Sequence, residues 1–195
     1  MSGPGKKRGK LVIISGPSGV GKSTICKALA KRTGAHLSVS ATPREISDKE
    51  VDGREYWFLP REDFLSRVEE GDFLEYAEVF GNFYGTPRSK VEEALEEGKT
   101  VILEIDIQGG EKARKIYKDA ETIFILPPSE SDLSERMQGR GRGEDSHAAK
   151  RRLEGAESEI LSAKESYKHM IVNDNLEEAI KEITGIMKTK TGEKE

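Results

Sequence analysis

The chain has 195 residues, of which 34% are hydrophobic and 35% are charged, and its net charge is −4. This length fits one domain with a sizeable core, and the nearly balanced charge argues against nucleic acid or an anionic membrane as a partner. The single cysteine, Cys26, excludes an internal disulfide and fits a reducing compartment. We therefore expect a cytoplasmic protein, with the choice between a monomer and a homodimer left open.

Neither a metal cluster nor a membrane span is predicted. The three histidines, His36, His147 and His169, share no ligand spacing with each other or with Cys26. No apolar run approaches the length of a membrane helix, and the basic N-terminus lacks the apolar region of a signal peptide. Residues 1–9 and 189–195 are polar and are expected to be mobile tails. The folded domain is predicted to span residues 10–188.

Apolar runs bounded by turn signals predict five buried parallel strands, at Leu11–Ile14, Leu37–Val39, Val101–Ile105, Thr122–Leu126 and Met170–Val172. The segments with helical spacing of apolar residues are Thr24–Arg32, Arg88–Glu97, Gly110–Tyr117, Glu130–Gln138, Ala148–Tyr167 and Leu176–Met187. This alternation predicts an α/β fold, a doubly wound parallel five-stranded sheet with helices on both faces. Ligands are then expected at the carboxyl ends of the strands.

Two stretches interrupt this alternation. Residues 40–98 contain short aromatic runs, the extended segment FLEYAEV and a predicted helix at Glu62–Glu70, which together indicate a mixed α+β insertion over the carboxyl edge of the sheet. The polar, glycine-rich segment Gly139–His147 indicates a flap between two helices. We expect a helical lid at about residues 137–157.

The segment GPSGVGKST follows the first predicted strand directly and precedes a predicted helix. It satisfies the P-loop pattern G-x-x-x-x-G-K-[ST], in which backbone N–H groups and the helix N-terminus surround the phosphates of a nucleotide. Lys22 is expected to reach the β- and γ-phosphates, and the Ser23 hydroxyl to bind Mg²⁺. The predicted binding residues are Gly16, Pro17, Ser18, Gly19, Val20, Gly21, Lys22, Ser23 and Thr24.

A P-loop alone does not distinguish a GTPase, an ATPase motor and a small-molecule kinase. The N-K-x-D guanine signature of GTPases is absent. The segment VILEIDIQGG places Asp106 at the carboxyl end of a buried strand. There its carboxylate is expected to hold Mg²⁺ through water or to contact a second substrate, and the alternative is a helix N-cap.

From about Lys10 to Met187 the sequence resembles the guanylate kinases. The resemblance is carried by GPSGVGKST, SVSATPRE, EVDGREYWF, FLEYAEVFGNFYGT, LEIDIQG, ILPPS, the GRG of the flap and VND. It implies the P-loop kinase fold and the Mg²⁺-dependent transfer of the γ-phosphoryl group of ATP to GMP, with dGMP as a further possible acceptor. ATP is then the nucleotide expected at Gly16–Thr24.

The resemblance also implies a guanine site. Guanine shows one acceptor, O6, and two donor groups, N1–H and the N2 amino group, along its pairing edge, and a carboxylate can accept from both donors. Glu75 matches the glutamate that binds guanine in the family, Ser40 the donor to O6 and Asp106 a contact to the amino group. Thr86 and its neighbour Gly85 are expected near the base. AMP would leave these groups mispaired.

For the GMP phosphate, the resemblance implies contacts from Arg44, Tyr56 and Tyr84. The sequence departs from the family here. The family usually has a second arginine three residues after the first, whereas this chain has Ser47 at that position. Losing one charge-assisted contact costs about 1.5–3 kcal/mol. We hypothesise that Lys49 or Arg54 compensates.

Three arginines of the lid region, Arg136, Arg140 and Arg152, match arginines that neutralise the moving phosphoryl group in the family, and Arg140 also contacts ATP there. Arg151 is hard to distinguish from Arg152. Asn173, in VND, resembles the family's adenine-side residue. No general base is assigned, because the acceptor is already an anionic phosphate oxygen.

Three alternatives remain open. A guanylate-kinase-like protein-binding domain shares the GMP-site pattern, but it typically has a degraded P-loop, whereas this one is intact. A related kinase of another phosphorylated acceptor, such as ribose 1,5-bisphosphate, is kept open by Ser47. An adenylate or pyrimidine monophosphate kinase is disfavoured by the positions of the carboxylates.

Overall fold

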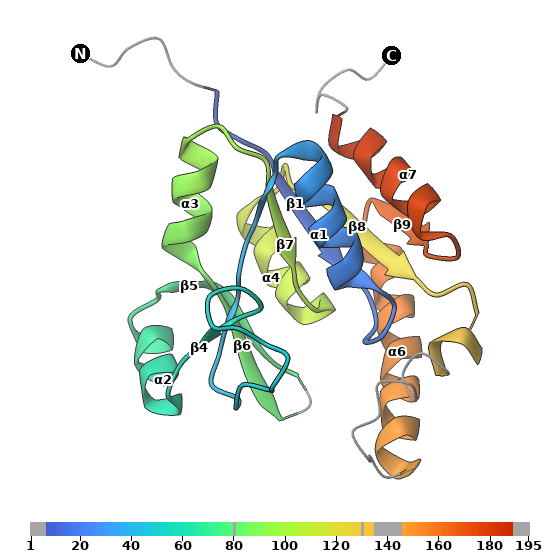
Figure 1. Ribbon diagram of the computed structural model, residues 1–195, viewed down its shortest axis with the longest axis horizontal. Helices are drawn as coiled ribbons and strands as arrows, with labels where there is room; N and C mark the ends of the chain where they lie inside the picture. The colour runs from blue at the N-terminus through green and yellow to red at the C-terminus, as the bar shows by residue number, and fades with distance from the viewer. Residues whose placement is uncertain (1–6, 80, 130, 135–145, 189–195) are drawn as a thin grey trace.

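Five parallel strands form the central sheet of the computed structural model, which describes residues 7–79, 81–129, 131–134 and 146–188 (Figure 1). They are β1 (Leu11–Ser15), β2 (His36–Leu37), β7 (Val101–Glu104), β8 (Glu121–Leu126) and β9 (His169–Val172). Their order is β2-β7-β1-β8-β9, and every neighbouring pair is parallel. The predicted five-stranded parallel sheet is confirmed. Since the strand order reverses at β1, the loop after β1 lies where such sheets bind ligands.

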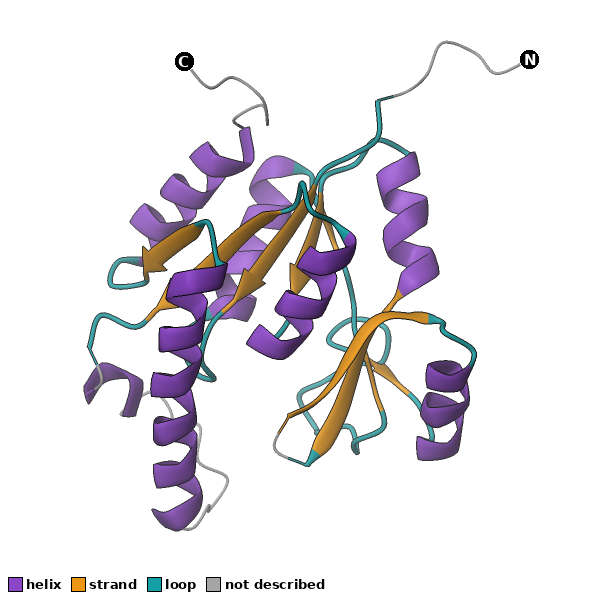
Figure 2. Ribbon diagram, turned by 180° about the vertical axis from the view of Figure 1, so that it is seen from behind, coloured by secondary structure: helices purple, strands orange, loops and turns teal. Residues whose placement is uncertain are grey.

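Helices cover both faces of this sheet (Figures 1 and 2). Along β1, Leu11 and Ile13 face one side and pack with helices α3 (Arg88–Glu96), α4 (Ile107–Ile116) and α6 (Ser146–Ser166). Val12 and Ile14 face the other side and pack with α1 (Lys22–Thr33) and α7 (Leu176–Lys188). Helix α1 contributes Cys26, whose side chain is fully buried. No helix in the described part of the chain is long and apolar enough to cross a membrane.

A second, smaller sheet lies beside the central one (Figure 2). It contains β3 (Ala41–Thr42), β4 (Trp57–Phe58), β5 (Phe73–Val79) and β6 (Asn82–Pro87), in the order β4-β3-β6-β5, with helix α2 (Arg61–Glu69) packed against it. Phe64 of α2 stacks on Phe73 and Phe83, with ring centroids 4.7 Å and 5.9 Å apart. β5 and β6 pair antiparallel, and this register sets Glu75 opposite Thr86.

Candidate active site

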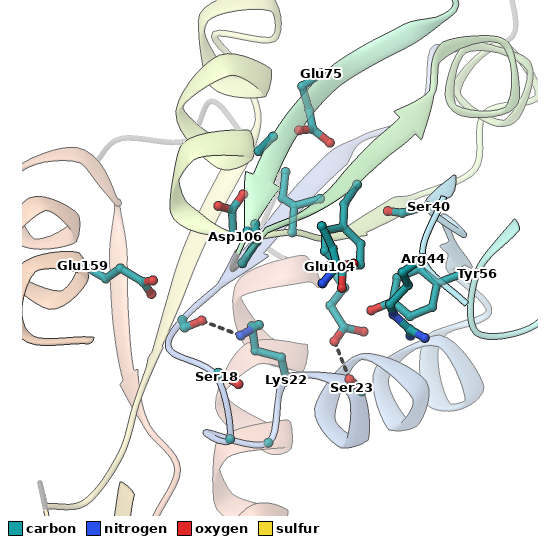
Figure 3. A pocket seen from close by; sticks show the side chains of 18 residues that line it. Ser18, Lys22, Ser23, Ser40, Arg44, Tyr56, Glu75, Glu104, Asp106 and Glu159 are labelled. Atoms are coloured by element: carbon teal, nitrogen blue, oxygen red, sulfur yellow. Dashed lines mark hydrogen bonds between the residues drawn. The ribbon is translucent and has the colours of Figure 1, made fainter. Parts of the chain in front are cut away.

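One pocket of about 480 Å³ lies between the loop after β1 and the second sheet (Figure 3). Its first wall is the P-loop, represented by Gly16, Ser18, Gly19, Gly21, Lys22 and Ser23. The opposite wall brings together five predicted residues, Ser40, Arg44, Tyr56, Glu75 and Tyr84, and a sixth, Asp106, lines the pocket from the start of α4. Pro17, Val20, Thr24, Gly85, Thr86 and Asn173 are not among the described residues that line it. The two predicted substrate sites therefore share one cavity.

Lys22 points along the P-loop and donates to two of its carbonyl oxygens, those of Gly16 and, at 2.9 Å, Pro17 (Figure 3). Burial lowers the pKa of Lys22, and the negative charges of Glu104 and Glu159 oppose that shift. The ammonium group is thus held by neutral carbonyl oxygens that an incoming phosphate can replace.

The P-loop is braced from behind by the last strand. The Asn173 side chain, just after β9, donates to the carbonyl oxygen of Val20 at 2.8 Å. Gly21 has a φ of 100°, and a Cβ there would lie 2.6 Å from Asn173 Nδ2. Only glycine tolerates this backbone conformation so close to the bracing side chain. Asn173 therefore contacts the loop itself, from outside the pocket.

Two carboxylates, Glu104 and Asp106, lie at the carboxyl end of β7. Glu104 accepts a hydrogen bond from the Ser23 hydroxyl. Asp106 Oδ1 accepts from the backbone N–H of Gly109 at 2.9 Å and so caps helix α4, and the same side chain lines the pocket. Asp106 is therefore both the N-cap of α4 and a residue that lines the pocket. No cluster of three or more His, Cys, Asp or Glu ligands occurs among the described residues.

Glu75 is a buried carboxylate on the second wall, and only 6% of it is exposed. Thr86 Oγ1 donates to its Oε1 at 2.5 Å. Burial raises the pKa of Glu75 to about 7, and Asp106 also raises it, whereas the Thr86 hydrogen bond lowers it. A Cβ on Gly109 would lie 2.5 Å from Glu75 Oε2, so the first turn of α4 approaches this carboxylate as closely as only glycine allows.

Arg44, Tyr56 and Tyr84 lie together at the same wall. The Arg44 guanidinium lies 5.1 Å from the centroid of the Tyr56 ring, and the Tyr56 and Tyr84 rings are 5.5 Å apart. Hydrogen bonding to Glu50, and secondarily to Tyr84, raises the pKa of Arg44. Aromatic hydroxyls and a guanidinium form a seat suited to a phosphate.

The suggested replacements for a second arginine are not at this seat. Lys49 is exposed, and Arg54 pairs instead with Glu55 at 2.9 Å. Neither residue is among the described residues that line the pocket. Ser47 itself donates to Glu50 through its hydroxyl at 2.7 Å. In the structure, Glu50 contacts both Ser47 and Arg44, and neither Lys49 nor Arg54 lies where a second phosphate-binding arginine would.

Three predicted residues belong to the lid region. Arg136 and Arg140 lie outside the described residues, and for Arg152 the structure describes only its place in α6. The same helix contributes a pocket residue that the sequence did not single out, Glu159 (Figure 3). Burial raises the pKa of Glu159 to about 7, Lys22 lowers it and Asp106 raises it. Nothing in the charge pattern of this long helix distinguishes Glu159 from its solvent-exposed neighbours.

Comparisons with known proteins agree with this arrangement. The family model described as guanylate kinase matches residues 8–190. A guanylate kinase from Clostridium acetobutylicum is 49% identical over 93% of this chain and 86% of its own length, and one from Clostridium perfringens is 51% identical over 92% and 83%. A crystal structure of guanylate kinase from Anaplasma phagocytophilum matches with a TM-score of 0.79 and 36% identity, covering 95% of this chain and 89% of that one. The chain therefore belongs to the guanylate kinase family and is a nucleoside-monophosphate kinase.

Proposed function

We propose that the chain transfers the γ-phosphoryl group of ATP to a phosphate oxygen of GMP, giving ADP and GDP, in the presence of Mg²⁺. The observation that carries this proposal is the pocket itself, in which a complete P-loop faces a buried glutamate across about 480 Å³. Of the alternatives, a protein-binding domain has no use for an intact P-loop lysine in such a pocket. A ribose bisphosphate has no base for Glu75 to recognise.

On the ATP side, the triphosphate takes the place of the carbonyl oxygens that now hold Lys22. The backbone of residues 16–24 then supplies N–H groups, and the N-terminus of α1 supplies its positive dipole end. Asn173 keeps the loop in shape through Val20. In the proposal, its adenine-side role is therefore indirect.

Mg²⁺ fits the oxygen groups near Ser23. The Ser23 hydroxyl is hydrogen-bonded to the Glu104 carboxylate, and Asp106 lies two residues further along the same pocket wall. A hydroxyl plus one or two carboxylates, completed by phosphate oxygens and water, is the donor set that Mg²⁺ prefers. We assign the metal site to Ser23 and Asp106, with Glu104 beside them. When bound, the ion would draw charge from the phosphate oxygens during transfer.

On the GMP side, Glu75 must be ionised to accept from both N1–H and the N2 amino group of guanine. Its pKa of about 7 means that it releases a proton when guanine binds below neutral pH. Thr86 occupies Oε1 and so fixes the orientation of the carboxylate. Ser40 and Asp106 complete the base site, and Arg44, Tyr56 and Tyr84 bind the acceptor phosphate.

The transfer step needs positioning and charge neutralisation and no general base. Lys22 neutralises the donor side, and Arg44 the acceptor side. We assign Arg136, Arg140 and Arg152 to the moving phosphoryl group, on the family resemblance alone. The proposal also includes a cytoplasmic location, which a single buried cysteine without a disulfide fits.

A coupled assay of ADP release tests this proposal, with GMP, dGMP, AMP, CMP, UMP and ribose 1,5-bisphosphate supplied one at a time with ATP and Mg²⁺. GMP is expected to exceed AMP in kcat/KM by about 10⁴-fold, since a polar site rejects a base that leaves its buried groups unpaired. Lys22→Ala should abolish turnover, and chelation of Mg²⁺ should do the same. Equal rates with AMP and GMP would refute the guanine site. Faster turnover of ribose 1,5-bisphosphate than of GMP would show that the sugar phosphate is the acceptor.

A further inference from the structure

A single carboxylate holds the guanidinium of Arg44. Arg44 Nη1 donates to Glu50 Oε2 at 2.8 Å, and Nη2 donates to Oε1 at 2.5 Å. Both side chains are mostly buried, with 17% of the arginine and 15% of the glutamate exposed. Two parallel charge-assisted bonds between planar groups fix orientation as well as distance.

The other hydrogen bonds of Glu50 come from Ser47. The Ser47 backbone N–H donates to Glu50 Oε2 at 3.0 Å, and its hydroxyl donates to the same oxygen at 2.7 Å. Hydrogen bonding to Arg44 above all, and then to Ser47, lowers the pKa of Glu50 to about 2. The short loop from residue 44 to residue 50 therefore closes on itself around one permanently ionised carboxylate.

Two aromatic rings also lie near the Arg44 guanidinium. The Arg44 guanidinium lies 5.1 Å from the centroid of the Tyr56 ring and 5.4 Å from that of Phe58, within the range of cation–π attraction. Its Nη1 also donates to the carbonyl oxygen of Glu45 at 2.8 Å. Of the five N–H groups of a guanidinium, three are thus used by the loop. The two that the loop does not use, on Nε and Nη2, can form a fork that matches two oxygens of a phosphate, and Tyr84 also hydrogen-bonds to this guanidinium.

We propose that Glu50 is a positioning residue for the acceptor phosphate, acting through Arg44. It turns the Nε and Nη2 edge of Arg44 into the pocket before the substrate arrives, and Ser47 completes the hydrogen bonds of Glu50 without a second cation. Among the described residues that line the pocket, the cationic side chains are Arg44 and Lys22, so this end relies on one prearranged guanidinium. The inference rests on the proposed function, since it takes the GMP phosphate as the ligand of Arg44.

The test compares Glu50→Gln with Ser47→Ala and with a matched control, Glu45→Gln, an exposed glutamate of the same loop. An amide in place of the Glu50 carboxylate cannot accept from both guanidinium nitrogens. We expect KM for GMP to rise ten- to hundredfold in Glu50→Gln, the cost of one lost charge-assisted contact. Ser47→Ala keeps the backbone bond to Glu50 and should raise KM by roughly two- to fivefold. Glu45→Gln should behave as the parent.

The second readout is binding of guanosine, which lacks the phosphate. Its Kd, measured by calorimetry, and KM for ATP should stay within about twofold of the parent in every variant, because neither depends on Arg44. An unchanged KM for GMP in Glu50→Gln overturns the inference. If the glutamine variant does not fold, an unchanged KM for GMP in Ser47→Ala overturns it. Equal weakening of GMP and guanosine also overturns it, since that would reflect general disorder of the loop. A parent protein that does not phosphorylate GMP refutes the proposed function instead.

Discussion

Glu75→Gln should make the protein more stable and a poorer enzyme. In the folded protein the pKa of Glu75 rises from 4.5 to about 7 because the carboxylate is buried. Between these two pH values the folded state keeps a proton that the unfolded state has released, so ionisation of Glu75 increasingly destabilises the fold as pH rises. At pH 8 this cost is about 3 kcal/mol, at 1.36 kcal/mol for each pH unit of difference.

Glutamine removes the ionisation but keeps an oxygen that can accept from Thr86. We therefore expect the free energy of unfolding at pH 8 to rise by about 1–3 kcal/mol, which raises Tm by roughly 2–10 °C in a protein of this size. At pH 4.5 the two proteins should unfold alike. Meanwhile kcat/KM for GMP should fall by about 10²-fold or more, because the amide presents a donor where guanine also presents one.

Thermal unfolding at pH 4.5 and pH 8, paired with steady-state kinetics, measures both effects. Glu78→Gln is the matched control, because Glu78 is an exposed glutamate on the same strand. It should change neither stability nor GMP turnover. A glutamine variant at position 75 that loses the same stability at both pH values would refute the claim that desolvation of an ionised carboxylate dominates at this site.

Gly109→Ala and Glu159→Gln test two residues around the pocket, and Gly185→Ala is the control for the first. Gly109→Ala should lower stability by about 1–3 kcal/mol and raise KM for GMP, because the new methyl group would collide with Glu75. Gly185→Ala, with open space around its Cβ position, should instead stabilise α7 by up to about 1 kcal/mol in the same melts. Glu159→Gln should flatten the pH dependence of KM for ATP between pH 6 and 8.5. In the parent, Glu159 ionises near pH 7 beside Lys22 and adds a negative charge where the triphosphate binds. The same rise in KM with pH in both proteins would contradict this account.

The sequence predicted the parts of the fold that depend on local pattern. The β1–P-loop–α1 unit, the five strands and the FLEYAEV strand β5 follow from apolar runs and turn residues. Boundaries were less accurate. Helix α4 begins at Ile107 and not at Gly110, because Asp106 caps it and two glycines lie inside its first turns.

Contacts made by folding were harder to foresee. The sequence placed Glu75, Arg44 and Asp106 in one site through family resemblance, and the pocket brings them together. It did not reveal that Glu50 would hold Arg44, because an acidic residue in a polar loop carries no local signal of its partner. Glu159 was missed for a related reason. Its position in the pocket depends on how α6 packs against the sheet, which helical periodicity does not specify.

The rate at which a thiol reagent labels the buried Cys26 would measure how often the ATP side of the molecule opens. It lies one turn into the helix that begins at Lys22, has no exposed surface, and burial raises its pKa well above the usual value. A thiol reagent can therefore react only after that helix separates from the sheet. A nucleotide at ten times its Kd should slow labelling about tenfold, because it binds only the closed form. Reaction with the single cysteine of the natural chain would thus report ligand binding without any added dye or engineered residue.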